Sequence, residues 1–482
     1  MLDFRPVLYI IGILLTTLAA AMCAPLVADL VVGHPDWQVF AGAAGLTAFI
    51  GVTLLLTTMA PPDRFSVRQA FVLTTLSWLA MTFFAALPFA FADLDLSFTD
   101  AFFEAMSGLT TTGSTVITSL DTAPSGILLW RAILQWLGGI GIIVMSIAIL
   151  PMLKIGGNQL FQMESSDRSE KVLPRVAQIA SGVGFIYLTL TAACAALLWM
   201  FGLKGFDAIA HAMTTIATGG FSTRDASIGA FLNPAVEVII TCFMLLGALP
   251  FVLYLQAVRG KPIMLVRDTQ VRWFFWVVVF FILTVTLAHN VNNDIHLGRA
   301  LRESAFNVVS IITGTGYSSA NYAGWGHFAT GIFFFIMFIG GCAGSTTCSI
   351  KIFRYQVLYE TAKMQMKHLI RPHGIFVGTF NGQPISDEVE NSVMSFFFLF
   401  MLTFAFLAGM LHFLGLDFLT AISGAASAIC NVGPALGDII GPTGNYSTLP
   451  DSAKWVLSAG MLLGRLELFT VLVLFAPWFW RG

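Results

Sequence analysis

Four short segments, spread along the sequence, have the residue types needed to bind a dehydrated cation through backbone oxygens. Each ends in a glycine, which can adopt positive φ without a steric penalty. Small residues and hydroxyls precede it, so consecutive carbonyls could turn toward one axis and replace the hydration shell of an ion. These glycine segments are Thr110-Thr111-Thr112-Gly113, Ala217-Thr218-Gly219-Gly220, Thr313-Gly314-Thr315-Gly316 and Cys430-Asn431-Val432-Gly433. One such segment alone is usually a loop, whereas four in register predict a common site.

The residues before each glycine segment predict a short helix. Thirteen positions before the final glycine stand Asp100, Asp207, Glu303 and Thr420. The roughly ten apolar residues that follow are too few to cross a bilayer but sufficient for two or three helical turns. Because a carboxylate stabilises a helix N-terminus, we expect the three acids at the N-terminal ends of half-helices. Each half-helix should enter the membrane and return as an extended strand that is buried or lines a watery cavity.

A run of small residues interrupts one apolar stretch in the third quarter of the chain. It comprises Gly340, Gly341, Cys342, Ala343, Gly344, Ser345, Thr346, Thr347, Cys348 and Ser349. Such a run forms a poor helix, because each glycine costs up to ~1 kcal/mol relative to alanine. The pattern favours an unwound loop beneath the glycine segments. The alternative interpretation is a helix that packs closely through small residues.

Arg465 is a charged residue inside the last apolar stretch. Four stretches share an apolar-Gly step, at Leu137-Gly138, Leu246-Gly247, Ile339-Gly340 and Leu463-Gly464. Arg465 follows the fourth step, so the repeat predicts a position beside the common axis. A charge in a span is costly and usually faces a polar interior. The alternative is a purely structural ion pair. Glu467 points elsewhere on the helix and could pair with a neighbouring span.

The elements that position these residues belong to a polytopic membrane protein, as the composition indicates. Of 482 residues, 57% are hydrophobic and 10% charged, and the mean hydropathy is +0.83, outside the range of soluble domains. Apolar stretches of about 20 residues, the length that crosses a bilayer, recur throughout. The predicted spans are residues 6–32, 38–59, 69–92, 128–153, 177–202, 234–258, 271–290, 327–350, 391–414 and 455–480.

The charges predict the orientation of these spans. With the N-terminus in the cytoplasm, most of the 24 Lys and Arg fall on inner segments, as the positive-inside rule requires. Acidic residues gather on the outer segments, where they are either solvated loop carboxylates or a ring that concentrates cations. The longest basic inner segment, from Lys351 to Arg371, looks helical. It is either ordinary juxtamembrane charge or a surface on which a cytoplasmic partner docks.

The strand Thr315-Gly316-Tyr317 resembles a degenerate potassium-channel signature, and the fourfold repeat in one chain resembles the TrkH/KtrB superfamily of potassium uptake proteins. The chain length and the Asn431-Val432-Gly433-Pro434 segment are more similar to TrkH. The resemblance covers nearly the whole chain. It implies an all-α polytopic membrane protein with ten transmembrane helices. Two extra helices come first, and the others form four pseudo-symmetric membrane-pore-membrane repeats around one pore.

The resemblance also implies the role of each segment. The glycine segments would form a potassium selectivity filter, and residues 340–347 with Arg465 an intramembrane gate. The two extra helices would occupy residues 1–66, and the pore repeats residues 67–160, 161–262, 263–375 and 376–482. Family members are homodimers whose cytoplasmic face binds a TrkA-like nucleotide-binding regulatory subunit.

The expected function is therefore potassium uptake across the bacterial inner membrane, with K⁺ as the transported ion. The rival is a secondary transporter with alternating access, such as a symporter of K⁺ with H⁺ or Na⁺. It would need repeats of opposite topology, whereas the charge bias gives all four one direction. No catalytic set, nucleotide-binding motif or nucleic-acid-binding pattern occurs in the sequence, so an enzyme or an assembly scaffold has no support.

Overall fold

The computed structural model describes residues 3–59, 66–148 and 172–481, and these are mostly helical. The ends of predicted span 128–153 and of the first predicted repeat, and the basic residues Lys154, Arg168 and Lys171, lie outside the described residues. Among those described, the only strands are β1 (Thr379–Phe380) and β2 (Gln383–Pro384), which form an antiparallel hairpin.

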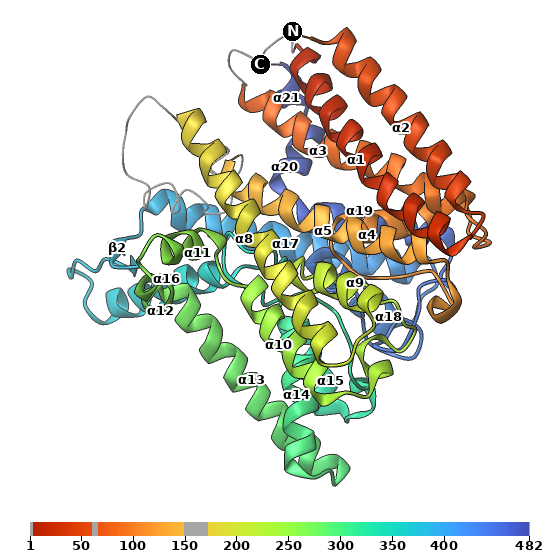
Figure 1. The fold of residues 1–482 in the computed structure, drawn as a ribbon. Coiled ribbons are helices and arrows are strands. Elements are labelled where there is room, and N and C mark those ends of the chain that lie inside the picture. Colours follow the sequence, from red (N-terminus) through yellow and green to blue (C-terminus); the bar gives the residue numbers. More distant parts are fainter. Residues whose placement is uncertain (1–2, 60–65, 149–171, 482) are drawn as a thin grey trace.

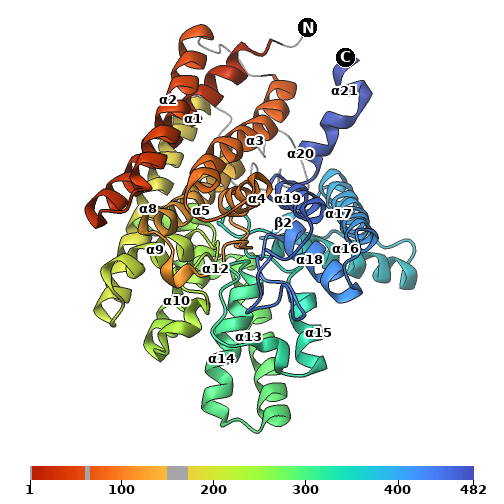
Figure 2. The same ribbon diagram turned by 90° about the vertical axis from the view of Figure 1, so that its right-hand side faces the viewer.

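Three long helices open the chain, α1 (Arg5–Val32), α2 (Trp37–Thr57) and α3 (Val67–Phe91). α1 and α2 form a hairpin, and α1 also packs against α3 and α5. The hairpin is tight because Gly12 and Gly51 face each other, and a Cβ on Gly12 would lie 2.9 Å from the carbonyl oxygen of Gly51. The two ends of the chain lie close together at this end of the molecule (Figures 1 and 2).

From α3 onward one order of elements recurs four times: a long helix, a half-helix and a second helix. The further long helices are α8 (Val172–Met200), α13 (Thr269–Asn293) and α17 (Asp387–Phe413). The half-helices are α4 (Phe98–Leu109), α9 (Gly205–Ile216), α14 (Leu297–Ile312) and α18 (Phe418–Cys430). The second helices begin with α5 (Ser125–Ala148), α10 (Pro234–Gly247), α15 (His327–Ile336) and α19 (Asp451–Arg465).

By length and composition, seven described helices could cross a membrane, or up to nine if each of two bent pairs is one span. Three predicted spans are not single helices. Span 234–258 is α10 followed by α11 (Phe251–Val258) at 92°, and span 455–480 is α19 followed at 108° by α20 (Phe469–Leu472) and η4 (Val473–Phe475). Only the ten residues of α15 in span 327–350 form a helix.

Backbone chemistry explains both bends. Pro250 precedes α11 and has no N–H to continue a helix. After α19, Glu467 and Leu468 take positive φ of 60° and 27°, which ends a right-handed helix. The prediction that each of these spans is one helix is wrong because the apolar residues continue through the breaks.

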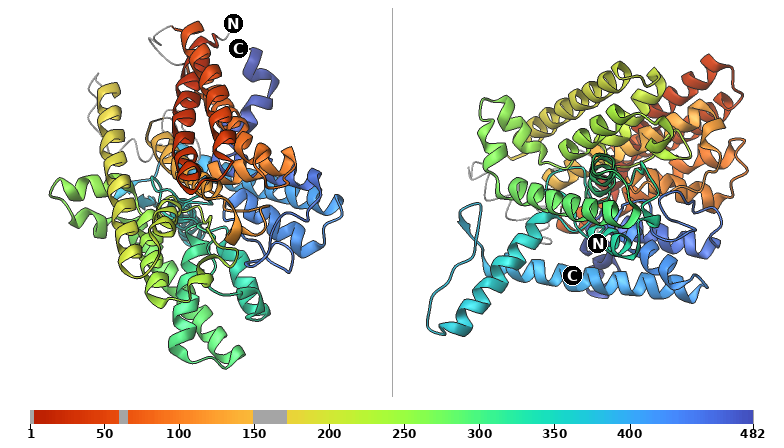
Figure 3. Two further views of the ribbon diagram at one scale, coloured as in Figure 1. Left: turned by 45° about the vertical axis from the view of Figure 1, so that its right-hand side comes forward. Right: turned by 90° about the horizontal axis from the view of Figure 1, so that it is seen from below.

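A basic helix, α16 (Ile352–Ile370), follows the small-residue run, so this segment is helical as expected. With the β1–β2 hairpin it projects from the body of the molecule (Figure 3). A separate small core, formed by Phe353, Val357, Phe380, Val389 and Val393, joins α16 to the hairpin and α17. The remaining described elements are η1 (Leu120–Thr122), η2 (Ser227–Phe231), α12 (Ile263–Arg267), η3 (Tyr322–Gly324) and α21 (Pro477–Arg481).

Candidate functional site

The four glycine segments meet around one axis in chain order. Each final glycine faces the carbonyl oxygen of the residue before the next final glycine, so closely that a Cβ would come within 3.0 Å of that oxygen. The pairs are Gly113 with Gly219, Gly220 with Thr315, Gly316 with Val432, and Gly433 with Thr112. Because the fourth pair returns to the first segment, the contacts form a closed ring of four pseudo-equivalent segments.

Backbone handedness turns the carbonyls of the ring in one direction. The final glycines have φ of 91°, 80°, 81° and 101°, and the residues two positions earlier, Thr111, Thr218, Gly314 and Asn431, have φ of 52°, 50°, 65° and 52°. When left-handed and ordinary residues alternate, successive carbonyls point to the same side of a strand instead of opposite sides. Three of these four earlier residues are not glycine, so the neighbouring structure must hold this costly conformation.

Hydrogen bonds tie the amides of the ring away from its axis. In every segment, the residue just before the final glycine donates its N–H to a carbonyl near the end of its own half-helix. These hydrogen bonds are Thr112 to Ser107 at 2.9 Å, Gly219 to Thr214 at 2.9 Å, Thr315 to Ser310 at 2.8 Å and Val432 to Ser427 at 3.0 Å. No donor among the described residues reaches the carbonyl oxygens of Thr112, Thr315 or Val432. These oxygens are therefore available to a cation. The fourth, on Gly219, also accepts a hydrogen bond from Gln135.

The half-helices point their C-terminal ends at this ring, because the glycine segments follow directly from them. The negative end of each helix dipole thus favours a cation there. At the opposite end of α4, Ser97 and Asp100 form a capping box. Asp207 is the third residue of α9, and its carboxylate accepts hydrogen bonds from Thr223 at 2.6 Å and Arg224 at 3.0 Å.

The expected N-terminal position is wrong for Glu303. α14 begins six residues earlier, at Leu297, and is capped by His296, so Glu303 lies in its second turn. There the Glu303 carboxylate contacts His289 at 3.2 Å and Arg299 at 2.6 Å. In the fourth repeat Asp417, rather than the aligned Thr420, is the cap. Hydrogen bonds from the side chain and the backbone N–H of Thr420 lower the pKa of Asp417 below its usual value.

The aligned glycines of the second helices pack directly beneath the ring. Cβ atoms on Gly138, Gly247 and Gly464 would lie against the carbonyl oxygens of Leu109, Ile216 and Ile429, at the ends of their own half-helices. In the third repeat Gly340 instead faces the carbonyl of Cys348, because the chain there is not helical. The symmetry of the four repeats is therefore broken by the small-residue run.

This run forms a loop between Ile336 and Ile352. Its ends are joined by the hydrogen bond from the Gly340 N–H to the carbonyl of Ile350, at 2.9 Å. The rest of the loop fills the break between α10 and α11. There the Cys342 N–H donates to the carbonyl of Ala248 at 3.0 Å, the Phe251 N–H to that of Gly344 at 3.0 Å, and the Thr346 N–H to that of Gly247 at 3.3 Å.

Arg465 joins this loop to the first repeat. It is the last residue of α19 and is 2% exposed. Its Nη2 donates to the carbonyl of Gly138 at 2.8 Å, and its Nη1 lies 3.2 Å from the carbonyl oxygen of Thr346 and 2.5 Å from Sγ of Cys348. The same Sγ is 4.0 Å from Oγ1 of Thr111 in the ring. The guanidinium therefore lies close below the glycine segments.

A cavity of about 30 Å³ lies at this point and is lined by Ser345, Thr347, Cys348, Lys351 and Arg465 among others. That volume holds about one water molecule. No ion pair links Arg465 to a carboxylate within the described part of the chain. Glu467 instead pairs with Arg354 of α16, whose guanidinium lies 3.8 Å from the centre of the Phe396 ring.

A buried ion pair behind the ring was not predicted from the sequence. Nε of Arg131 lies 2.8 Å from Oε1 of Glu104, and both side chains are at most 1% exposed. Arg131 also donates to the carbonyl of Ser222 at 2.7 Å and stacks on Phe221, 4.0 Å from the ring centre. It therefore supports the backbone just after the second glycine segment. The signal was an arginine inside a predicted span, which demands a partner.

Four half-helices around a closed ring of carbonyls, inside a strongly apolar helical chain, define a multi-pass membrane protein for cation transport. The chain belongs to the TrkH family, described as cation transport proteins, which it matches over residues 37–481. The resemblance inferred from the glycine segments is thus confirmed.

Individual relatives agree with this assignment. The chain is 46% identical to the Trk system potassium uptake protein TrkI of Halomonas elongata over 479 residues, which cover 99% of this chain and 97% of that protein. It is 35% identical to the Trk system potassium uptake protein TrkH of Escherichia coli, with full coverage of both chains. The crystal structure of the potassium transporter TrkH from Vibrio parahaemolyticus matches with a TM-score of 0.92 and 35% identity, and each chain is covered completely.

Proposed function

We propose that this chain takes up potassium ions across the bacterial inner membrane through the ring of carbonyls. The observation that carries the proposal is the closure of the four glycine segments on one another, with Gly433 facing Thr112. The names of the relatives, potassium uptake proteins and a potassium transporter, support the same ion. The two extra helices and the four repeats then give ten spans in all, and the repeats form one pore.

In this proposal the ion loses its water at the ring. Two levels of oxygen are available, one from the carbonyls just before the final glycines and one from the carbonyls a residue earlier, on Thr111, Thr218, Gly314 and Asn431. The C-terminal ends of the half-helices add negative potential. Oxygen ligands at both levels replace hydration and let the ion pass between adjacent sites.

Below the ring, the loop and Arg465 form the gate. The loop occupies the break between α10 and α11, and the Arg465 guanidinium places a positive charge close to the ion path. A TrkA-like nucleotide-binding subunit in the cytoplasm docks on α16 and controls the loop, which precedes that helix directly. The protein is a homodimer with one pore in each protomer, and its N-terminus is cytoplasmic.

Uptake of radioactive rubidium into sealed vesicles tests the function. Purified protein in vesicles should admit rubidium down its own gradient, with competition by K⁺ stronger than by Na⁺, and vesicles without protein serve as the control. Comparing uptake with and without a proton gradient tests the alternative of alternating access with symport. Uptake that requires an imposed proton or sodium gradient would overturn the channel-like mechanism. Absence of rubidium uptake under every gradient, also in a variant whose loop is shortened by deleting residues 342–346, would overturn potassium transport.

A further inference from the structure

Gln135 of α5 holds the backbone on both sides of Gly220. Its side chain is fully buried. Nε2 donates a hydrogen bond of 2.5 Å to the carbonyl oxygen of Gly219, and Oε1 accepts one of 3.0 Å from the N–H of Phe221. One amide side chain therefore fixes the orientation of both peptide groups that flank the final glycine of the second glycine segment.

The second glycine segment has the weakest restraint of its own. In the first and third segments, hydroxyls two residues apart bond each other, Thr110 with Thr112 at 2.8 Å and Thr313 with Thr315 at 2.7 Å. The equivalent residues of the second segment are Ala217 and Gly219, which have no hydroxyl. Two successive glycines also make this backbone the most permissive of the four.

The fourth segment also lacks such a hydroxyl pair, but other side chains hold it. The carbonyl of Gly433 accepts hydrogen bonds from Ser427 at 2.8 Å, Ser114 at 2.9 Å and Tyr446 at 2.7 Å. Asn431 donates to the hydroxyl of Thr112 at 2.9 Å. Only the second segment depends for its orientation on an amide from a second helix.

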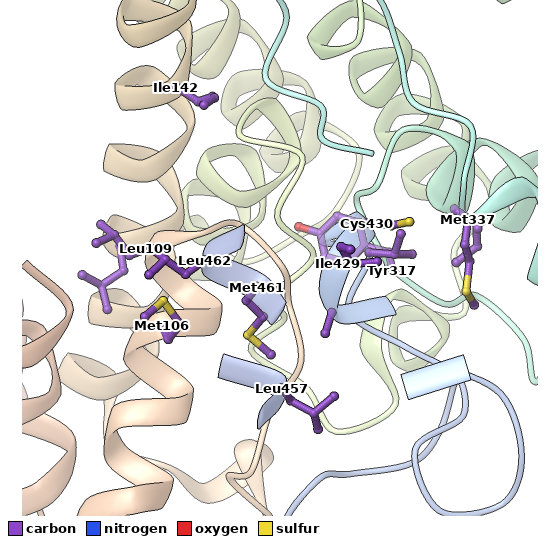
Figure 4. Packing of buried hydrophobic residues seen from close by; sticks show 14 of the residues in the cluster. Met106, Leu109, Ile142, Tyr317, Met337, Ile429, Cys430, Leu457, Met461 and Leu462 are labelled. Carbon is purple, nitrogen blue, oxygen red and sulfur yellow. The ribbon is translucent and has the colours of Figure 1, made fainter. Parts of the chain in front are cut away.

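The position of Gln135 is polar in one repeat alone. Three residues before the aligned glycine, the other second helices carry Met244, Met337 and Met461, all fully buried in the apolar core. Figure 4 shows Met337 and Met461 among the packed side chains of that core. The size of the side chain at this position also differs together with that of the residue just before the next final glycine. Gln135 lies against Gly219, where a Cβ would collide with its amide, whereas the residues equivalent to Gly219 are Thr112, Thr315 and Val432.

We propose that Gln135 is a positioning residue for ion selectivity, which fixes the orientation of the Gly219 carbonyl within the ring. The inference rests on the proposed function, since it assigns a determinant of selectivity within the same ring. Without the amide, the Gly219–Gly220 peptide loses a restraint, and the distance of one of the four oxygens from the ion is no longer fixed. Discrimination between K⁺ and the smaller Na⁺ then falls, while the path remains open.

The test compares K⁺/Na⁺ permeability ratios in vesicles, because a ratio does not depend on how much protein is folded. Gln135→Met, which introduces the residue type of the other three repeats, should lower the ratio about fivefold, the factor that corresponds to one hydrogen bond. Gln135→Glu keeps the shape and the acceptor for Phe221 and loses the donor when its carboxylate is ionised. At a pH high enough to ionise it, the variant should lower the ratio at least as much. Gln256→Met is the matched control, because Oε1 of Gln256 has no partner among the described residues.

A compensating pair separates positioning from general disruption. Gly219→Thr alone should collide with Gln135. Gln135→Met combined with Gly219→Thr reproduces the methionine and threonine that the repeat pairs as Met244 with Thr315 and Met461 with Thr112, and it should restore most of the ratio. An unchanged ratio in Gln135→Met and Gln135→Glu, with a lowered ratio in Gly113→Ser, would overturn the role of Gln135 and leave the proposed function intact. If Gly113→Ser also left the ratio unchanged, the carbonyl ring would not be the selective site.

Discussion

The carbonyl oxygen of Thr112 faces the α-carbon of Gly433, so the last glycine segment of the chain closes on the first. These residues are 321 positions apart in the sequence, yet their contact repeats the one between neighbouring segments around the ring. Because each final glycine has no side chain, the carbonyl oxygen of the next segment fits against it. A side chain at any of the four positions must move an oxygen of an adjacent segment.

Gly113→Ser should weaken discrimination against Na⁺ more than it reduces total flux. The new Cβ would displace the carbonyl of Gly219 and strain a residue whose φ is 91°. The measurement is the K⁺/Na⁺ permeability ratio beside total rubidium uptake. Gly415→Ser is the control, because Gly415 has a similar φ of 94° and no atom within 4 Å of its Cβ position. Equal ratios in the two variants would remove Gly113 from the selective site.

Breaking the buried pair behind the ring should destabilise the fold. Glu104→Ala leaves Arg131 without its carboxylate in a site from which water is excluded, which costs about 3–5 kcal/mol. Thermal unfolding in detergent should therefore shift strongly downward. Glu360→Ala is the control, since its pair with Lys363 is partly exposed and such pairs contribute at most ~1 kcal/mol. If Glu104→Ala combined with Arg131→Met were no more stable than Glu104→Ala, the cost would not come from the unpaired charge.

The fourfold repeat could be predicted from the sequence because it depends on particular residue types at fixed spacing. A strand that must approach a neighbouring carbonyl requires glycine, and a second helix that must pack under a half-helix requires it again at Gly138, Gly247 and Gly464. Both requirements are local and visible without a structure. The alignment that placed Arg465 next to Gly464 also places it beneath the ring.

Other features depend on partners that no spacing reveals. The hydrogen bond between Gln135 and Gly219 joins residues 84 positions apart, and a glutamine in an apolar stretch has no periodicity to distinguish it. Glu303 was misplaced because α14 starts with the polar residues around His296 and extends beyond the apolar segment that served as its signal. The bends after Gly247 and Arg465 were missed because hydropathy averages over them.

Shortening the loop should leave a pore that conducts without its regulator. Deleting residues 342–346 removes the hydrogen bonds to Gly247 and Ala248 and one acceptor of Arg465. The two residues to be joined need little movement, because a Cβ on Gly341 would lie 2.8 Å from Oγ1 of Thr347. Rubidium flux in the absence of any partner protein should therefore rise. If the deletion variant kept its thermal stability but showed wild-type or lower flux, the loop would serve only in packing and would not be a gate. Gly331→Ala is the control, because Gly331 lies in α15 just before the loop, meets no atom within 4 Å and has no positive φ; its flux should change little.

Arg465→Ala should raise potassium flux. If the guanidinium stands ~10 Å from the ion path, an effective dielectric of ~20 gives a repulsion of about 1.7 kcal/mol for a passing cation. This corresponds to a rate effect on the order of tenfold. Arg465→Lys keeps the charge and should change the flux much less. The measurement is rubidium flux per folded protomer for both variants, beside thermal stability in detergent.

A structural role for Arg465 predicts a different ranking. The guanidinium satisfies the carbonyls of Gly138 and Thr346, and losing both hydrogen bonds in a buried site costs about 1–3 kcal/mol for each group left unpaired. Arg465→Ala would then be poorly assembled, and Arg465→Lys, whose single amine cannot reach both carbonyls in the same geometry, would be harmed as well. A stable alanine variant with raised flux therefore assigns Arg465 to the gate. A stable alanine variant without a gain in flux excludes it from the ion path.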